Sequence, residues 1–338
     1  MARKERIELI RQIEDHRGSR LICCLTSDRQ NAAGIIAKDF IPVFFNRLLK
    51  FQSGRKIDVL MCTIGGDTLA AFGLSRLIRE FTDTVAVLVP EKCQSAGTLF
   101  ALGANEIFMT RAATLSPIDP SVNGPLNPVV ELAPGQRQSV AVSVESVAGY
   151  RALVTEDWRL NDAGTDIAFK ILAEQINPLA LGDVYRSRQQ IERLARTLIK
   201  YHRQDERNIE KIVQEITRGL GSHDYLISRK EARELLGTQV AGDDVILENL
   251  VWKLFCDFRD EMQLGQIFDP MMILHASLQA GKKPPVINEQ KVVIVEVAEG
   301  GDEFERVAQV SQGQVMTPSG PTGLAQVAIV RAGWKSYD

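Results

Sequence analysis

Four short apolar runs, separated by segments of helical periodicity, dominate the first third of the chain. They lie at 20–25, 57–63, 84–90 and 106–110 and are rich in Val, Ile, Leu and Cys. Runs of this length without polar alternation are typical of strands that are buried on both faces of a sheet. Between the second and third runs, apolar residues recur at helical spacing: Leu69, Phe72, Leu74, Leu77 and Ile78. Strand alternating with helix predicts an α/β fold with a parallel sheet and right-handed crossovers.

The composition is that of an ordinary globular protein and not of a nucleic-acid-binding one. The 338 residues are 45% hydrophobic and 25% charged, and 40 basic against 43 acidic residues give a formal net charge of −3. Such a balance provides no excess positive charge for phosphate backbones or anionic membranes. We therefore expect no nucleic acid as the main partner.

The N-terminus predicts a charged amphipathic helix and not a secretory signal. It lacks an apolar signal core, and its apolar residues share one helix face: Ile7, Leu9, Ile10 and Ile13. No stretch approaches the roughly 18 apolar residues that a membrane span requires. The five cysteines show neither a CxxC pair nor a histidine at zinc-site spacing. We expect a cytoplasmic protein with reduced core thiols, no membrane span and no metal site.

Two loops with unusual residues each join a predicted strand to a predicted helix. The first, CTIGGDT, contains Gly65 and Gly66, and the second, KCQSAGT, contains Ser95. Both fall at the carboxyl edge of a parallel sheet, where ligands bind in folds of this kind. Paired glycines let backbone N–H groups approach a substrate closely. A serine at a helix N-terminus lies where the helix dipole and free N–H groups stabilise negative charge.

Together the two loops contain the parts of an acyl-transfer site. Ser95 is the candidate nucleophile, and the N–H groups of Ala96 and of Gly65 or Gly66 are the candidate oxyanion hole. Each loop also has a simpler interpretation, because serine before a helix is often an N-cap and Gly-Gly after a strand is often a turn. The presence of both loops at one sheet edge favours the acyl-transfer site. With neither a phosphate loop nor a dinucleotide fingerprint in the sequence, we expect no cofactor.

Three segments also carry a family resemblance. In order and spacing, IDVLMCTIGGDTLAAFGLSRLIRE, VPEKCQSAGTLFALGANEIFMT and ATLSPIDPS resemble the serine dehydrogenase proteinase family of the Clp protease and crotonase-like superfamily, to which signal peptide peptidase A is related. The specific resemblance covers residues 5–125, and a weaker one appears in INPLALGDVYRSRQQIERLA and SHDYLISRKEARELLG. It implies a Clp/crotonase-like spiral of β-β-α units, homo-oligomerisation, and hydrolysis of peptide bonds by Ser95. It also assigns the oxyanion hole to Gly65, Gly66 and Ala96, in agreement with the two loops.

The general base is the open part of this site. A serine hydroxyl is a poor nucleophile until a neighbouring group accepts its proton. Clp protease has a histidine where this chain has Asp119, and the window in which compact signal peptide peptidases carry their lysine contains none. Three residues remain as candidates for the base or for its orientation: His223, Lys170 and Asp119.

Lys170 and Asp119 each have a functional and a structural interpretation. Lys170 lies beside an apolar helical face formed by Ile167, Ile171 and Leu172, where desolvation would lower its pKa. Alternatively it is a surface lysine that keeps its charge in water. Asp119 is held between two prolines in a stiff loop, where it would orient a base or a substrate amine, or cap a turn.

His223 is the remaining candidate. It precedes a helix for which Ser228 is the expected N-cap and Glu231 completes a capping box. The resembling family places this segment near the rim of the active site, which favours His223 as the base. The alternative is a turn histidine without a chemical role.

We divide the chain into three parts: a serine peptidase domain at 1–240, a helical extension at 241–282 and a small β-rich segment at 283–338. The last part begins within GKKPP, and beyond this motif three strand-like runs joined by Gly/Pro turns predict an antiparallel sheet. Such a segment suits a protein partner or the closure of an oligomer.

The leading functional hypothesis is a serine peptidase that acts on peptides or unfolded protein through a Ser95 acyl-enzyme. The alternative is a catalytically weak or inactive assembly or partner-binding protein of the same fold, since the usual base positions are empty. Acyl-CoA chemistry of the crotonase kind ranks third, because the Ser95 motif matches the peptidase branch.

Overall fold

The computed structural model describes residues 3–51, 54–118, 121–122, 125–133, 136–140, 142–220, 222, 224–317 and 320–338. Its strands are β1 Ser19–Thr26, β2 Lys56–Cys62, β3 Val85–Val89, β4 Lys92–Cys93, β5 Glu106–Met109, β6 Thr114–Leu115, β7 Ser121–Val122, β8 Val129–Ala133, β9 Gln136–Ser139, β10 Val142–Ser143, β11 Ile227–Ser228, β12 Val286–Val297, β13 Gly300–Thr317 and β14 Gly320–Tyr337. Its α-helices are α1 Arg3–Arg17, α2 Phe40–Leu48, α3 Thr68–Arg79, α4 Ala96–Leu102, α5 Val144–Ala152, α6 Asp162–Gln175, α7 Pro178–Ile199, α8 Glu206–Gln214, α9 Arg229–Leu236, α10 Val245–Met262 and α11 Pro270–Gln279. Two π-helical segments, η1 Leu153–Asp157 and η2 Glu215–Gly219, and a 3₁₀ turn, η3 Gly237–Gln239, complete the helical part.

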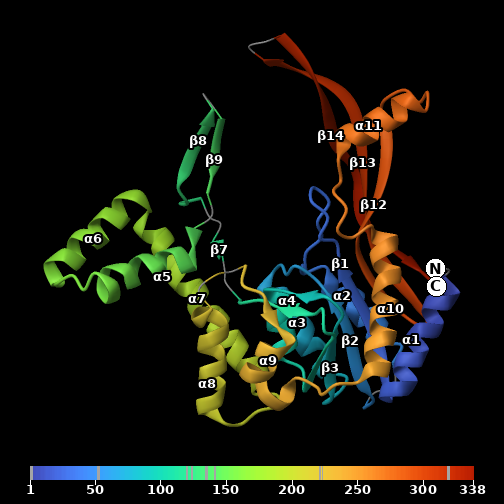
Figure 1. Ribbon diagram of the computed structural model, residues 1–338, viewed down its shortest axis with the longest axis horizontal. Helices are drawn as coiled ribbons and strands as arrows, with labels where there is room; N and C mark the ends of the chain where they lie inside the picture. Colours follow the sequence, from blue (N-terminus) through green and yellow to red (C-terminus); the bar gives the residue numbers. More distant parts are fainter. Residues whose placement is uncertain are drawn as a thin grey trace.

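A seven-stranded sheet with the order β14-β13-β12-β1-β2-β3-β5 forms the centre of the molecule (Figure 1). The four apolar runs of the first third are the strands β1, β2, β3 and β5, and they pair in parallel as predicted. Alternate residues of β1 enter different core clusters: Leu21 and Cys23 face one side, and Ile22 and Cys24 face the other. Burial on both faces explains why these strands lack polar alternation. The predicted α/β class is confirmed.

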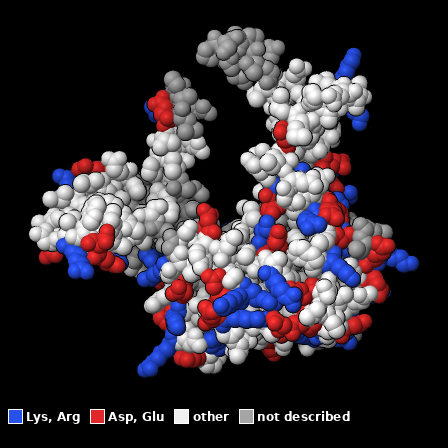
Figure 2. Space-filling model, in the orientation of Figure 1, with Lys and Arg blue, Asp and Glu red and all other residues white. Residues whose placement is uncertain are grey.

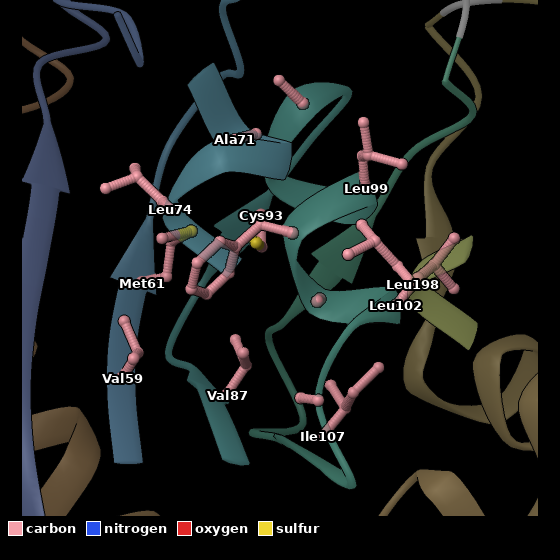
Figure 3. Packing of buried hydrophobic residues seen from close by; sticks show 14 of the residues in the cluster. Val59, Met61, Ala71, Leu74, Val87, Cys93, Leu99, Leu102, Ile107 and Leu198 are labelled. Atoms are coloured by element: carbon pink, nitrogen blue, oxygen red, sulfur yellow. The ribbon is translucent and has the colours of Figure 1, made fainter. Parts of the chain in front are cut away.

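Helices cover both faces of the sheet. α1 and α10 pack on one face, and α2, α3 and α4 pack on the other. Figure 3 shows this second layer, where Met61 of β2 lies beside Leu74 of α3, and Val87 of β3 and Leu99 of α4 belong to the same cluster. Complete burial of side chains of this size contributes roughly 1.5–3 kcal/mol each.

The predicted β-β-α repeat is visible in the chain order. β3 is followed by the short β4 and then by α4, and β5 is followed by the short β6. After β2, Thr63 forms a parallel bridge with Cys93 of β4 before α3 begins. β4, β6 and β11 form a second, small sheet beside the main one. The β-β-α unit is thus complete at β3, β4 and α4, whereas β2 reaches the second sheet only through the bridge at Thr63.

The three C-terminal strands form an antiparallel sheet as predicted, but this sheet does not stand alone. β12 pairs antiparallel with β1, so the C-terminal segment continues the main sheet. The domain boundary at residue 283, which would make the last segment a separate folding unit, therefore remains a prediction. The outer halves of β13 and β14, together with α11, extend beyond the body; we call this projection the C-terminal arm (Figure 1). A search of the described helices finds none with the length and apolarity to cross a bilayer.

Candidate functional site

Ser95 lies in a sharp turn between β4 and α4. Its backbone has φ 50° and ψ −112°, a conformation that side chains rarely adopt and that costs about 1–3 kcal/mol. It occupies the N-cap position of α4, yet its side chain makes no capping hydrogen bond. The simple N-cap interpretation therefore does not account for the serine. Ser95 is partly buried, and a strained strand-to-helix turn of this kind also holds the nucleophilic serine of α/β-hydrolases.

A buried relay of hydroxyl groups holds this turn. The Ser95 N–H donates to Ser116 Oγ at 2.8 Å, and the Ser116 N–H donates to Thr98 Oγ1 at 3.1 Å. The Thr98 hydroxyl donates to the carbonyl of Cys93 at 2.8 Å, which returns the relay to the chain before the turn. Ser116 and Thr98 are both buried, so these bonds are shielded from water. Ser116 was not predicted from the sequence; a polar residue directly after the apolar Leu115 was its only signal.

The glycine loop has the backbone geometry that only glycine adopts easily. Gly65 has φ 110° and Gly66 has φ 145°. The Ile36 N–H donates to the Gly65 carbonyl and the Asp67 N–H donates to the Ile36 carbonyl, both at 2.8 Å. These two bonds flank Gly66 as in a parallel bridge, so the N–H of Gly66 points away from Ile36. The Gly65 N–H already donates to Thr63 Oγ1 at 3.0 Å, which makes Gly66 the better candidate donor.

The two loops meet, as their positions after parallel strands predict. The Thr63 N–H donates to the carbonyl of Lys92, and the Gln94 N–H donates to the carbonyl of Thr63, both at 3.0 Å. A Cβ on Gly65 would lie 2.8 Å from Ser95 Cβ and 3.3 Å from the backbone nitrogen of Ala96. Gly65, Ser95 and Ala96 are therefore in direct contact. The structure thus brings together Gly65, Ser95 and Ala96, and Gly66 is the next residue of the same loop.

Of the candidate bases, the structure describes only Lys170. It is exposed on α6, which packs on η1 and stands apart from α4 (Figure 1). This placement does not bring Lys170 to Ser95, and its side chain is not buried as the apolar helical face predicts. Asp119 and His223 lie outside the described residues.

The chain on either side of His223 is attached to the segment that holds Ser95. Before it, the carbonyl of Ile216 accepts the N–H of Ile118 at 3.0 Å. After it, Ile227 of β11 pairs with Leu115 of β6. Leu115 and Ile118 flank Ser116, the hydrogen-bond acceptor for the Ser95 N–H.

Lys92, the lysine nearest to Ser95 in sequence, is occupied by an ion pair. Its Nζ lies 2.6 Å from Asp28 Oδ2. Burial lowers the pKa of Lys92, but the hydrogen bond to Asp28 and the negative charges of Glu91 and Asp28 together outweigh burial and raise that pKa. A lysine that stays protonated cannot accept the serine proton.

The cysteines near the sheet centre are inert thiols. Cys23, Cys24, Cys62 and Cys93 are free and buried, whereas Cys256 is partly exposed. Burial raises the pKa of Cys24 and of Cys62 to about 12. These four cysteines lie in the core, as expected from the sequence. In the described part of the chain, no group of three or more His, Cys, Asp or Glu side chains is placed to hold a metal ion.

Comparison with known proteins finds one family model and two relatives that are similar to parts of this chain. The family model of ClpP-like SDH-type serine proteinases matches residues 1–141. Uncharacterized protein MJ0137 of Methanocaldococcus jannaschii is 26% identical over 243 residues, which are 68% of this chain and 71% of that protein. Uncharacterized protein MJ1495 of the same organism is 27% identical over 240 residues, 68% of this chain and 70% of that protein.

Solved structures of proteases are also similar. ClpP1 from Listeria monocytogenes matches with a TM-score of 0.37 and 16% identity over 71% of this chain and 99% of its own. The membrane-bound stomatin-specific protease 1510-N, solved with a substrate peptide, matches with a TM-score of 0.37 and 14% identity over 68% of this chain and 77% of its own. The family resemblance that the motifs indicate is confirmed by the family model: residues 1–141 match the ClpP-like SDH-type serine proteinases.

Proposed function

We propose that the protein is a peptidase that cleaves peptide bonds through an acyl-enzyme on Ser95. The observation that carries this proposal is the strained Ser95 turn, which has φ 50°, makes no capping bond and is packed against Gly65. Strain of this kind persists only where the surrounding structure holds it, and it is concentrated at functional sites. The match of residues 1–141 to a serine proteinase family supports the same activity.

The proposed reaction follows from the positions of the groups. Ser95 Oγ attacks the carbonyl carbon of the scissile bond while the base takes the hydroxyl proton. The carbonyl oxygen becomes an oxyanion and accepts hydrogen bonds from the N–H groups of Ala96 and Gly66. The C–N bond then breaks, the amine leaves with the proton from the base, and water hydrolyses the ester by the same steps. Each oxyanion donor of this type contributes about 10²–10³ in rate.

We assign the role of general base to His223. A neutral imidazole with an ordinary pKa of about 6.5 accepts a proton at neutral pH. Two contacts support this choice. Ile216 and Ile227, on either side of His223 in the sequence, hydrogen-bond or pair with the segment 115–118, which contains the acceptor of the Ser95 N–H. Asp119, one residue after Ile118, is assigned the orientation of that base.

The proposal extends to the substrate and to the state of the protein. A homo-oligomer in the cytoplasm that cleaves extended peptides or unfolded segments fits the family and the exposed surface. Several large apolar side chains of α6 and α7 face solvent: Ile167, Phe169, Ile171, Leu179 and Tyr185. Exposed apolar surface of this extent is typical of a contact with another protein chain.

Intact-mass spectrometry after incubation with a fluorophosphonate tests the nucleophile and the base together. The parent protein should gain one adduct, and Ser95→Ala should gain none. We expect His223→Ala to label far more slowly than the parent and Lys170→Ala to label at the parent rate. Labelling of Ser95→Ala at the parent rate would contradict the proposed nucleophile, and full-rate labelling of His223→Ala would contradict the base.

A second candidate function is binding without efficient catalysis. The observation in its favour is that neither Lys92 nor Lys170 can serve as the base, Lys92 because of its ion pair and Lys170 because of its exposed position on α6. In that case the folded parent would not label, yet it would still bind an extended peptide, which fluorescence anisotropy with a labelled peptide would measure.

A further inference from the structure

β14 is the edge strand of the main sheet and is much longer than an average strand. It pairs with β13 from Tyr337, opposite Gly301, to Gly320, opposite Thr317. Strands in globular proteins average about 5–6 residues, whereas β14 has 18. The outer side of an edge strand has unpaired N–H and C=O groups, which can pair with a strand of another chain.

The outer half of β14 lacks the features that normally protect an edge. Charged side chains, especially lysine, and prolines are the usual protection. The segment 307–330 contains no Asp, Glu, Lys or Arg, and no proline follows residue 321 in β14, although 25% of the whole chain is charged. The two charges of β14, on Arg331 and Lys335, lie closer to the body and pair with Glu305 at 3.4 and 3.3 Å.

Apolar side chains project from both faces of this edge. Leu324, Val327, Ile329 and Val330 are between 42% and 53% exposed. Odd and even residues of a strand point to opposite faces, so both faces are apolar here. α11 covers Ala308 and Val310 of β13 completely. Beside them, Val327 and Ile329, their partners on β14, remain half exposed.

The arm as a whole is poor in charge. α11 contains no Asp, Glu, Lys or Arg, and it exposes Met271, Met272 and Leu278. Figure 2 shows many charged side chains on the body but few on the upper part of the arm. Pairing of the β14 edge with a strand of another chain would satisfy its backbone groups and bury the apolar surface beside them.

We propose that β14 pairs antiparallel with β14 of a second copy of this chain. An uncharged edge is complementary to itself, because a two-fold antiparallel pair brings no like charges opposite each other. The two-fold axis would lie perpendicular to the sheet, so the faces covered by α11 stay on the same side. Val327 and Ile329 of each copy then pack beside those of the other, and the two α11 helices flank the new strand pair. The pairing is independent of the peptidase activity proposed above.

Cysteine cross-linking in the full-length chain tests the predicted symmetry. The starting protein carries Cys256→Ser, because the other four cysteines are buried. Single cysteines are placed at Leu324, Gln326, Val327 and Ala328, all of which precede the register shift of β14 at Val330. A disulfide requires Cα atoms about 4.4–6.8 Å apart. One residue step away from the axis adds about 7 Å to the distance between the two copies of a residue, because each strand rises about 3.4 Å per residue. Disulfide dimers should therefore form strongly at one position and fall steeply on either side.

Charge substitution gives an independent readout. Val327→Lys and Val330→Lys place a charge on the proposed interface, and Ile246→Lys is the matched control on α10, where the side chain is 63% exposed. Sedimentation velocity should show the particle mass falling to half in both β14 variants and unchanged in the control, with unchanged circular dichroism for all three. A mass unaffected by either β14 variant, or a disulfide yield that is equal at all four positions, would overturn the proposal. The proposal would also be overturned if the β14 variants lost the binding of a different protein while their own particle mass stayed unchanged.

Discussion

Gly65 is the position where a single methyl group should disable the proposed nucleophile. A Cβ there would lie 2.8 Å from Ser95 Cβ and 3.0 Å from the carbonyl oxygen of Gln94, closer than such atoms approach in proteins. Neither neighbour is the free end of a flexible side chain, so the turn itself must move. Gly65→Ala should therefore displace Ser95 from its position against the oxyanion donors.

The expected magnitude has two parts. The positive φ of 110° costs an alanine about 1–3 kcal/mol of folding free energy. Displacement of a reacting group by about 1 Å costs about 10²-fold in rate. We expect Gly65→Ala to be less stable to urea by that free energy and to react with the fluorophosphonate about 10²-fold more slowly.

Gly54→Ala separates these two parts. Gly54 has φ 83°, yet a Cβ there would meet no atom within 4 Å. This control should lose stability by a similar amount and keep the parent labelling rate. If folded Gly65→Ala labelled as fast as the parent, contact between Gly65 and Ser95 would be irrelevant to the reaction, and the proposed geometry of the site would be wrong.

Three further predictions concern the groups that support the site and the fold. Ser116→Ala removes the acceptor of the Ser95 N–H and should lower the free energy of urea unfolding by about 1–3 kcal/mol. It should also slow the labelling by the fluorophosphonate. A Ser116→Ala protein that labels at the parent rate would exclude a positioning role for Ser116. Arg6→Met removes the ion pairs of Arg6 with the buried Asp257 and Glu296 and with the partly exposed Glu261 and should cost about 3–5 kcal/mol. A loss below about 1 kcal/mol would contradict this. Burial opposes the charge of Asp28, but the hydrogen bonds from Lys92 and from a backbone N–H lower its pKa. Because the folded pKa lies below the unfolded one, Asp28 stabilises the fold above the unfolded pKa, and the urea-midpoint difference between parent and Asp28→Asn should vanish as the pH falls through the folded pKa. A difference that is constant from pH 7 to pH 3 would contradict the assignment.

Much of the architecture could be predicted because it depends on neighbours in the sequence. The parallel strands are visible as apolar runs, since burial on both faces removes polar alternation. The capping box of Ser228 and Glu231 forms as predicted, since it joins residues three apart. The meeting of Gly65 and Ser95 was predictable as well, because parallel strands place the loops that follow them at one edge.

Other features depend on contacts between distant segments. Ser116 supports Ser95 across 21 residues, and a serine hydroxyl in a sequence does not indicate which backbone N–H it will meet. The pairing of β12 with β1 joins two segments that are far apart in the sequence into one sheet. It could not be predicted from the sequence, because backbone hydrogen bonds are not encoded by particular side chains. Lys170 shows the same limit: an apolar helical face predicts burial, but α6 leaves that face exposed, and only the packing of whole helices decides what covers it.

The sequence by itself therefore determined the strands, the helix caps and the two loops with Ser95 and Gly65, since each follows from local periodicity or backbone chemistry. Only the tertiary structure decided the strained φ of Ser95, its support by Ser116 and the exposure of the β14 edge. These features depend on contacts between residues that are far apart in the sequence. The free energies of such contacts are not visible in the local sequence pattern.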